Sequence, residues 1–152
     1  MRTSSCMYDS SNKNNFVHLT NQCLQLNSAE YGNFEEGNTV SFEEFEEYLN
    51  LMHGEKHATT SLCLDTLIVP RMKDLILDTL LSVENRINPN SRKNCFELFG
   101  FDFLVDEDFR VWLIEVNTNP YLGVPNKQIG ALLPKMLNEM FTIVLDPHFP
   151  PA

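Results

Sequence analysis

Residues 99–105 read Phe99-Gly-Phe-Asp-Phe-Leu-Val105, and residues 111–117 read Val111-Trp-Leu-Ile-Glu-Val-Asn117. Both runs are rich in aromatic and branched apolar residues, and the acidic segment between them has the composition of a turn, so they predict an antiparallel β-hairpin. Each predicted strand also carries one acid, Asp102 or Glu115. A carboxylate among apolar neighbours loses its hydration, which is costly unless a counter-charge offsets it. A divalent cation shared by both acids is the simplest such counter-charge.

The predicted register of the hairpin starts from a turn closed by Val105 facing Arg110. Side chains alternate between the two faces of a strand, so this register fixes which residues share a face. The other facing pairs are Asp102 with Leu113, Gly100 with Glu115, and Leu98 with Asn117. Gly100 has no side chain and is expected to leave space opposite Glu115.

In this register Asp102, Glu115 and Asn117 share one face, and the two acids are diagonal neighbours within reach of one metal ion. Two carboxylates and one amide oxygen are hard ligands that suit Mg²⁺ or Mn²⁺. A pair of surface acids on a half-exposed hairpin is the alternative interpretation. The acid face also carries Leu98, Leu104 and Leu113, and the core face carries Phe99, Phe101, Phe103, Val105, Trp112, Ile114 and Val116.

Three helices are predicted around the hairpin. The first begins at Ser41, which forms a capping box with Glu44 ahead of an apolar stripe. The second runs over about residues 70–84, with a proline in its first turn. The third runs over residues 127–145 and is expected to be interrupted or kinked at Pro134.

Residues 16–24 predict a short strand with an embedded polar cluster, His18-Leu-Thr-Asn21. Because a lone hairpin is only marginally stable, we expect it either to pair with this strand or to join strands that the chain does not contain. The elements together predict an α+β fold in which helices pack on an antiparallel sheet. On this view the chain is the C-terminal part of something larger.

Composition and charge narrow the range of partners. A chain of 152 residues can bury one good core. Its net charge of −10 opposes nonspecific binding to nucleic acid, which depends on basic residues.

The sequence has no apolar run long enough to cross a membrane and no signal peptide at its N-terminus. Its 4 cysteines are widely spaced and form no C-x-x-C pattern, which favours reduced, cytosolic thiols.

The hairpin acids by themselves allow two kinds of chemistry. In ATP-dependent ligation, carboxylates hold the Mg²⁺ of a bound nucleotide. A metal-dependent nuclease instead pairs an Asp with a later acid-x-Lys, but here Asn117 occupies the Lys position and the net charge opposes DNA. The ligase is therefore favoured. Arg2 is a further candidate, because a guanidinium forms bidentate pairs with phosphate oxygens.

Several segments together resemble the tubulin-tyrosine ligase-like family, whose members are amino-acid ligases with an ATP-grasp fold. They occur in family order, and the last two are the most specific in combination. The segments are Arg2-Thr-Ser-Ser5, His18-Leu-Thr-Asn-Gln22, Tyr31-Gly with Glu35-Glu-Gly-Asn38, Phe96-Glu-Leu-Phe-Gly-Phe-Asp-Phe103 and Trp112-Leu-Ile-Glu-Val-Asn-Thr-Asn-Pro120. The resemblance covers nearly the whole chain and implies that residues 1–152 are a fragment, the C-terminal portion of such a ligase domain.

The resemblance also implies roles for individual residues. It implies that Asp102, Glu115 and Asn117 bind Mg²⁺ together with ATP, with Mn²⁺ as a possible substitute. It places the catalytic Arg2 near the phosphates or the acceptor peptide. The residues implied to contact the nucleotide are His18, Leu19, Thr20, Asn21 and Ile114.

The implied reaction activates a carboxylate as an acyl phosphate, which an amine then attacks to form an amide bond. The implied partners are tubulin or another acidic protein tail and a free amino acid, with tyrosine, glutamate and glycine all open. The implied setting is the cytoplasm, including the cytoskeleton and cilium, without nucleic-acid or membrane partners. Because the family's N-terminal and central parts are missing, the isolated chain is expected to be inactive. A noncatalytic module derived from such a ligase, which binds tubulin or another partner, is the alternative.

Overall fold

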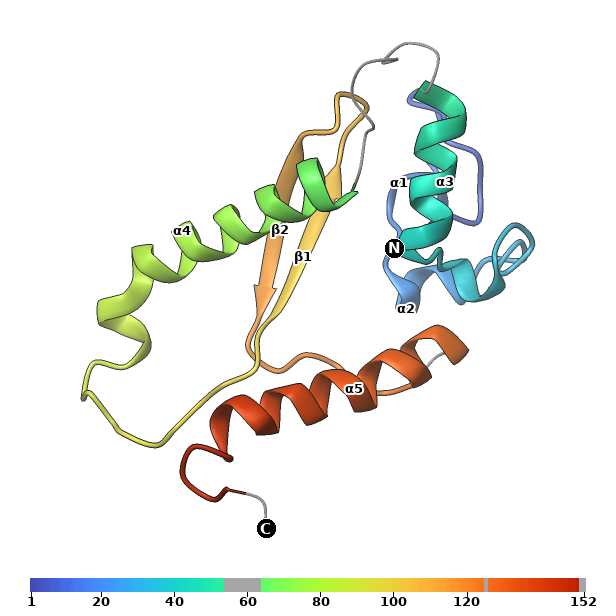
Figure 1. Cartoon of the computed structure of the whole chain (residues 1–152). Helices are drawn as coiled ribbons and strands as arrows, with labels where there is room; N and C mark the ends of the chain where they lie inside the picture. Colours follow the sequence, from blue (N-terminus) through green and yellow to red (C-terminus); the bar gives the residue numbers. More distant parts are fainter. Residues whose placement is uncertain (54–63, 125, 151–152) are drawn as a thin grey trace. The chain divides into compact units, whose positions relative to one another are not determined.

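The computed structural model describes residues 1–53, 64–124 and 126–150. It contains helices and one antiparallel two-stranded sheet, so the predicted mixture of elements is confirmed (Figure 1). The chain divides into two compact units, Met1–Glu55 with Gly123–Glu139 and Lys56–Leu122 with Met140–Ala152. Within the described ranges, no helix combines the length and the apolar character needed to cross a bilayer.

Among the described residues, three short helical turns precede the first of the longer helices, a fourth leads directly into the second, and the third follows the two strands (Figure 1). The helical segments are α1 (Asn15–His18), α2 (Gln22–Gln25), the 3-10 turn η1 (Glu36–Asn38), α3 (Phe42–His53), the π-helical turn η2 (Leu64–Ile68), α4 (Val69–Ile87) and α5 (Lys127–Val144). The strands are β1 (Gly100–Val105) and β2 (Val111–Asn117), drawn in yellow and orange.

The strand predicted over residues 16–24 is wrong, because α1 and α2 occupy this segment. Each begins at an asparagine that caps it. The Asn14 Oδ1 atom accepts a hydrogen bond from the Phe16 N–H at 3.0 Å, and the Asn21 Oδ1 atom accepts one from the Cys23 N–H at 2.9 Å. Such caps satisfy backbone donors at a helix start and favour a helical turn over a strand. Among the described residues the hairpin forms the whole sheet, so it does not pair with this segment.

The first predicted helix is confirmed as α3, together with its capping box. The Ser41 N–H donates to Glu44 Oε2 at 2.7 Å, and the Glu44 N–H donates to Ser41 Oγ at 3.1 Å. The same unit buries Leu49 of α3 and Val17 of α1. The capping box therefore fixes the start of a helix that contributes to the core of this unit.

The second and third predicted helices are confirmed as α4 and α5. Helix α4 is slightly longer than predicted and has Pro70 in its first turn. Its side chains at helical spacing are half-buried, namely Met72, Leu75, Ile76, Thr79, Leu80 and Val83. Helix α4 contacts η2 and β2, and the buried residues of this unit include Ile68 of η2 and Val111 of β2. Helix α5 continues through Pro134, so it is not interrupted there, and the kink at this residue stays a prediction.

Candidate functional site

The observed register of the hairpin differs from the predicted one. Val105 pairs with Val111 rather than with Arg110, and Asp102 pairs with Glu115. The register shifts between Asp102 and Phe103, where Ile114 is the extra residue of β2. Such a bulge changes which residues of the two strands face each other. The two acids are therefore directly opposite each other, not diagonal neighbours as predicted.

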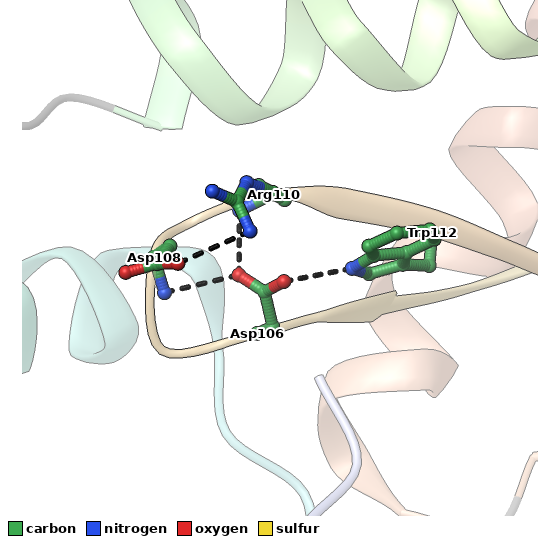
Figure 2. Close-up of polar contacts among 4 residues, drawn as sticks. All are labelled: Asp106, Asp108, Arg110 and Trp112. Carbon is green, nitrogen blue, oxygen red and sulfur yellow. Dashed lines mark hydrogen bonds and ion pairs between the residues drawn. The ribbon is translucent and has the colours of Figure 1, made fainter.

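The turn is longer than predicted because Asp106 organises it (Figure 2). One carboxylate oxygen of Asp106 accepts hydrogen bonds from the N–H groups of Asp108 at 3.0 Å and Arg110 at 2.9 Å. The other accepts one from Trp112 Nε1 at 2.8 Å. The Asp106 N–H also donates to the Arg110 carbonyl at 3.0 Å, and Phe109 takes a φ of 61°. Residues 106–110 thus form the loop between the strands.

Electrostatics in the turn favour the charged form of Asp106. The hydrogen bond from the Trp112 indole is the main cause of a lowered pKa of the Asp106 carboxyl, and backbone N–H groups add to it. Arg110 forms an ion pair with Asp108, with 3.2 Å between Nη1 and Oδ2 (Figure 2). Asp106, Asp108 and Arg110 therefore make these polar contacts within the turn and with Trp112 of β2.

Asn117 links the two hairpin acids. Its Nδ2 atom donates to Asp102 Oδ2 at 3.1 Å and to Glu115 Oε1 at 3.3 Å. Both carboxylates are exposed, so the expectation that they lose their hydration among apolar neighbours is wrong, and their exposure agrees with the alternative of two surface acids. Rotating the Asn117 amide would present its oxygen in place of its nitrogen and complete a set of three oxygen ligands. This donor chemistry fits Mg²⁺ or Mn²⁺.

The donor set at the hairpin has only two charged members. In the part of the chain that the structure describes, no group of three or more His, Cys, Asp or Glu residues could hold a metal ion. A hard cation usually completes its shell with water and, in nucleotide enzymes, with phosphate oxygens. The hairpin itself thus offers two carboxylates and one amide, fewer ligands than such a cation takes.

The bulge also redistributes the apolar residues between the two faces of the hairpin. Trp112 pairs with Leu104, whereas Leu113 pairs with Phe103. The prediction that Trp112 and Ile114 lie on the core face is wrong, because they are 52% and 61% exposed. The placement of Leu113 on the acid face is also wrong. One extra residue in β2 is enough to exchange these faces, because side chains alternate.

Gly100 has a different role from the predicted one. It pairs with Asn117 instead of Glu115. A Cβ atom at this position would lie 3.0 Å from the Pro120 Cβ atom. Gly100 thus allows the turn after β2 to approach β1, and the prediction of space opposite Glu115 is wrong.

Arg2 lies in an extended segment of the other unit. Its Nη1 atom donates to Gln22 Oε1 at 2.9 Å, and its backbone forms an antiparallel bridge with Thr39. On either side, the Thr3 N–H donates to the Asn38 carbonyl at 3.0 Å and the Val40 N–H to the Met1 carbonyl at 2.9 Å. The backbone of Arg2 is therefore held by a short two-segment pairing that the sequence pattern did not predict.

His18 is the last residue of α1, and the three residues Leu19–Asn21 connect it to α2. The His18 ring contacts the Asn12 carbonyl through Nε2 and meets the Tyr8 ring edge-on, with 5.8 Å between ring centroids. Leu19 and Thr20 are exposed. Asn21 uses its side-chain oxygen to cap α2. These residues share a unit with Arg2, whereas Asp102, Ile114, Glu115 and Asn117 belong to the other unit.

A buried polar cluster near Arg2 was not predicted. Gln25, Ser5 and Asn38 are 0%, 1% and 5% exposed. Ser5 and Asn38 lie at the ends of two of the motifs quoted above, but nothing in those motifs shows that they are buried. Gln25 carries no signal in the sequence at all, because its four-residue helix is too short to show a period.

The chain belongs to the Tubulin-tyrosine ligase family, whose model matches residues 1–152. It is similar to the probable tubulin polyglutamylase TTLL9 of Mus musculus, with 33% identity over 129 residues that cover 85% of this chain and 26% of that protein. It is also similar to the probable alpha-tubulin polyglutamylase Ttll1 of Tetrahymena thermophila, with 33% identity over 87% of this chain and 30% of the relative. Tubulin glycylase 3D of the same organism is 31% identical over 96% of this chain and 14% of its own length. The chain thus spans less than a third of each of these three relatives.

Proposed function

We propose that this chain supplies the metal-holding hairpin of an ATP-dependent ligase that joins an amino acid to a protein tail such as that of tubulin. The observation that carries the proposal is the Asn117 amide, which lies within hydrogen-bond distance of both Asp102 and Glu115. This cluster occurs in a chain of a family whose similar members are named as tubulin polyglutamylases and glycylases. An ATP-grasp architecture and an acyl-phosphate intermediate are parts of the same proposal.

The three hairpin residues would act as one ligand set. Asp102 and Glu115 would hold Mg²⁺ through carboxylate oxygens, and Asn117 would turn its amide so that the oxygen faces the ion. Bound there, Mg²⁺ would neutralise phosphate charge and orient a nucleotide. In the structure, Asn117 bridges the two carboxylates and so reduces the repulsion between them.

The residues of the other unit would contact the nucleotide and the acceptor. Arg2 already donates one N–H group to Gln22, and its remaining guanidinium donors suit a phosphate or an acceptor carboxylate. In this unit, His18 and the exposed Leu19 and Thr20 would be nucleotide contacts. In the hairpin unit, the exposed Ile114 would be an apolar contact of the nucleotide. Asn21 would serve the unit of Arg2 as the cap of α2. The names of the relatives make glutamate and glycine the first amino acids to test, on tubulin.

Metal binding is tested on the chain itself by NMR with Mn²⁺, which broadens signals close to it. In the wild-type chain, amide signals of β1 and β2 around Asp102 and Glu115 should broaden first. The variants Asp102→Asn and Glu115→Gln should lose this local broadening. Glu107→Gln is the matched control, because it removes one charge from the same hairpin. Broadening that persists in both site variants would contradict the proposed metal site.

Ligation is tested in the longest available chain that carries these residues. Transfer of labelled glutamate or glycine to tubulin should require Mg·ATP, and Asp102→Ala or Glu115→Ala should abolish it. Retained turnover in either variant would contradict the ligase role of the hairpin. Calorimetric titration with Mg·ATP separates this role from the noncatalytic alternative, which predicts no nucleotide binding in any chain that carries the hairpin.

A further inference from the structure

Helix α2 carries two glutamines three residues apart, and both contact the segment that holds Arg2. Gln22 accepts the hydrogen bond from the Arg2 guanidinium at 2.9 Å. Gln25 is fully buried and accepts a hydrogen bond from the Ser5 N–H at 2.9 Å through Oε1. Positions i and i+3 of a helix lie on the same side, so one helical turn can reach both the side chain and the backbone of this segment.

The amide nitrogen of Gln25 contacts a second segment. Its Nε2 atom donates to the Phe16 carbonyl at 3.0 Å and to the Leu19 carbonyl at 2.5 Å. These two carbonyls lie on either side of Val17 and His18, and the Leu19 carbonyl directly precedes Thr20. A glutamine side chain has two donor hydrogens and one acceptor oxygen, and Gln25 uses all of them. One buried side chain thus joins the Arg2 segment to the His18–Asn21 segment.

Asn38, from a third segment of the chain, contacts both Gln25 and the segment that holds Arg2. Its Nδ2 atom donates to Ser5 Oγ at 2.8 Å, to the Thr3 carbonyl at 3.3 Å and to Gln25 Oε1 at 3.4 Å. Its Oδ1 atom accepts a hydrogen bond from the Gly32 N–H at 2.8 Å. No buried side-chain nitrogen or oxygen among the described residues lacks a partner. A fully satisfied buried network specifies one arrangement, because any shift would leave a buried polar atom unpaired.

We propose that Gln25 is a positioning residue that fixes Arg2 relative to the segment His18–Asn21. What the positioned groups bind rests on the proposed function above. Gln25 itself is fully buried, so it would act through the residues it holds and not by touching the nucleotide or the acceptor. Its role is to hold the exposed Arg2 and the exposed residues His18–Asn21 at a fixed separation.

Two variants of Gln25 separate the effect of its acceptor oxygen from the effect of its donor nitrogen. Gln25→Met keeps the length and volume of the side chain but removes every hydrogen bond. Gln25→Glu keeps the acceptor for Ser5 and Asn38 but, when ionised, loses both donors to the carbonyls of Phe16 and Leu19. The matched control is Gln128→Met, because Gln128 is an exposed glutamine of α5 that donates to Glu44 at 3.4 Å.

The structural readout is amide hydrogen exchange and NMR of the chain. In Gln25→Met, the Ser5 amide should exchange at least about tenfold faster, and the Arg2 guanidinium and His18 ring signals should both move. In Gln25→Glu, Ser5 should keep its protection while the His18 ring signals move. Gln22→Met should release the Arg2 guanidinium without affecting Ser5. Gln25→Glu serves as the folded test if Gln25→Met does not fold, and unchanged His18 ring signals in it would contradict the proposal. Wild-type Ser5 exchange and His18 signals in Gln25→Met would overturn the proposal.

The functional readout is the ratio kcat/KM in a chain that is active as a ligase. Gln25→Met should lower kcat/KM by about tenfold to a hundredfold, chiefly by raising KM for the nucleotide or the acceptor. A purely structural role would instead lower kcat in proportion to the folded fraction and leave KM unchanged. Equal kcat/KM in Gln25→Met and Gln128→Met would overturn the positioning role. Absence of ligase activity in the wild type would contradict the proposed function alone, and the exchange experiment would still test Gln25.

Discussion

The Asp106 carboxylate receives hydrogen bonds from the Asp108 and Arg110 backbone and from the Trp112 indole. These bonds favour its ionised form and lower its pKa from the usual 3.8, with the indole as the largest cause. A lowered pKa in the folded state means that ionised Asp106 stabilises the hairpin above its usual pKa. This contribution is lost as the pH falls from the usual value through the lower, folded-state value.

We therefore expect the environment of Trp112 to change with acidification below about pH 4. Because the chain has 1 tryptophan, its fluorescence and its indole N–H signal report on this site alone. Asp106→Asn should remove the acid transition of the indole signal. Glu107→Gln, which removes a charge from the same turn, should retain it. An indole signal that titrates identically in Asp106→Asn and the wild type would contradict this assignment.

Asp106 also shows what residue types alone could not predict about the hairpin. The run Asp106-Glu-Asp108 correctly indicated a turn, but the length of the turn depends on which backbone N–H groups the carboxylate reaches. It further depends on Phe109, whose φ of 61° is uncommon for a residue with a bulky side chain. Neither feature leaves a pattern in the sequence, so the predicted register was wrong.

At the scale of helices, the capping box of α3 was predictable because both of its residues stand at fixed spacing next to an apolar stripe. Ser41→Ala removes the oxygen that accepts the Glu44 N–H. We expect a loss of about 1 kcal/mol in the free energy of unfolding, measured by urea denaturation. Ser82→Ala in the interior of α4 is the control, and its effect should stay within about 0.5 kcal/mol. Equal losses in both variants would show that the cap contributes nothing specific.

Helix α5 contains Pro134, which has no N–H to donate to the carbonyl of Gly130, four residues earlier. A proline inside a helix is about 3 kcal/mol less favourable than alanine. Since Pro134 is exposed, Pro134→Ala should stabilise the chain by up to about that amount, with increased helical circular dichroism. Lys135→Ala, at the adjacent exposed position, should change stability little. A destabilised Pro134→Ala variant would mean that the proline ring makes a packing contact that outweighs the missing hydrogen bond.

Long helices and short ones differ in how far the sequence reveals them. The apolar spacing of α4 and α5 extends over several turns, and it predicted both helices within a few residues. In contrast, α1 and α2 have four residues each, so no period can develop. Their asparagine caps are visible in the sequence only once the helical turns are known. The bulge at Ile114 escaped prediction for a similar reason, since neither strand carries a glycine or proline at the shift.

At the scale of the whole chain, the candidate residues fall into two groups that the motifs did identify. Arg2 and the segment 18–21 belong to one unit, and the acid pair with Asn117 belongs to the other. The resemblance to family motifs pointed to both groups, because a motif is defined by the identities of its residues. It did not find Gln25, which joins the elements of the first unit through buried hydrogen bonds. Residues that support a site through burial are visible only in a structure.

The net charge of −10 predicts that salt in general stabilises the whole chain, because ions screen repulsion among the acids. Mg²⁺ should act in addition through the hairpin, since a ligand bound only by the folded state adds stability, about 2.7 kcal/mol at a hundredfold excess over its Kd. At equal ionic strength, thermal unfolding followed by Trp112 fluorescence should therefore occur at a higher temperature in MgCl₂ than in NaCl.

Two double variants with the same change in net charge separate screening from binding. Asp102→Asn with Glu115→Gln removes both hairpin acids, and Glu43→Gln with Glu47→Gln removes two acids of α3. Each pair removes two negative charges, so each should reduce the general response to NaCl. Only the hairpin pair should abolish the additional effect of MgCl₂. If the α3 pair abolishes it equally, Mg²⁺ stabilises the chain through its overall charge, and the hairpin does not act as a metal site.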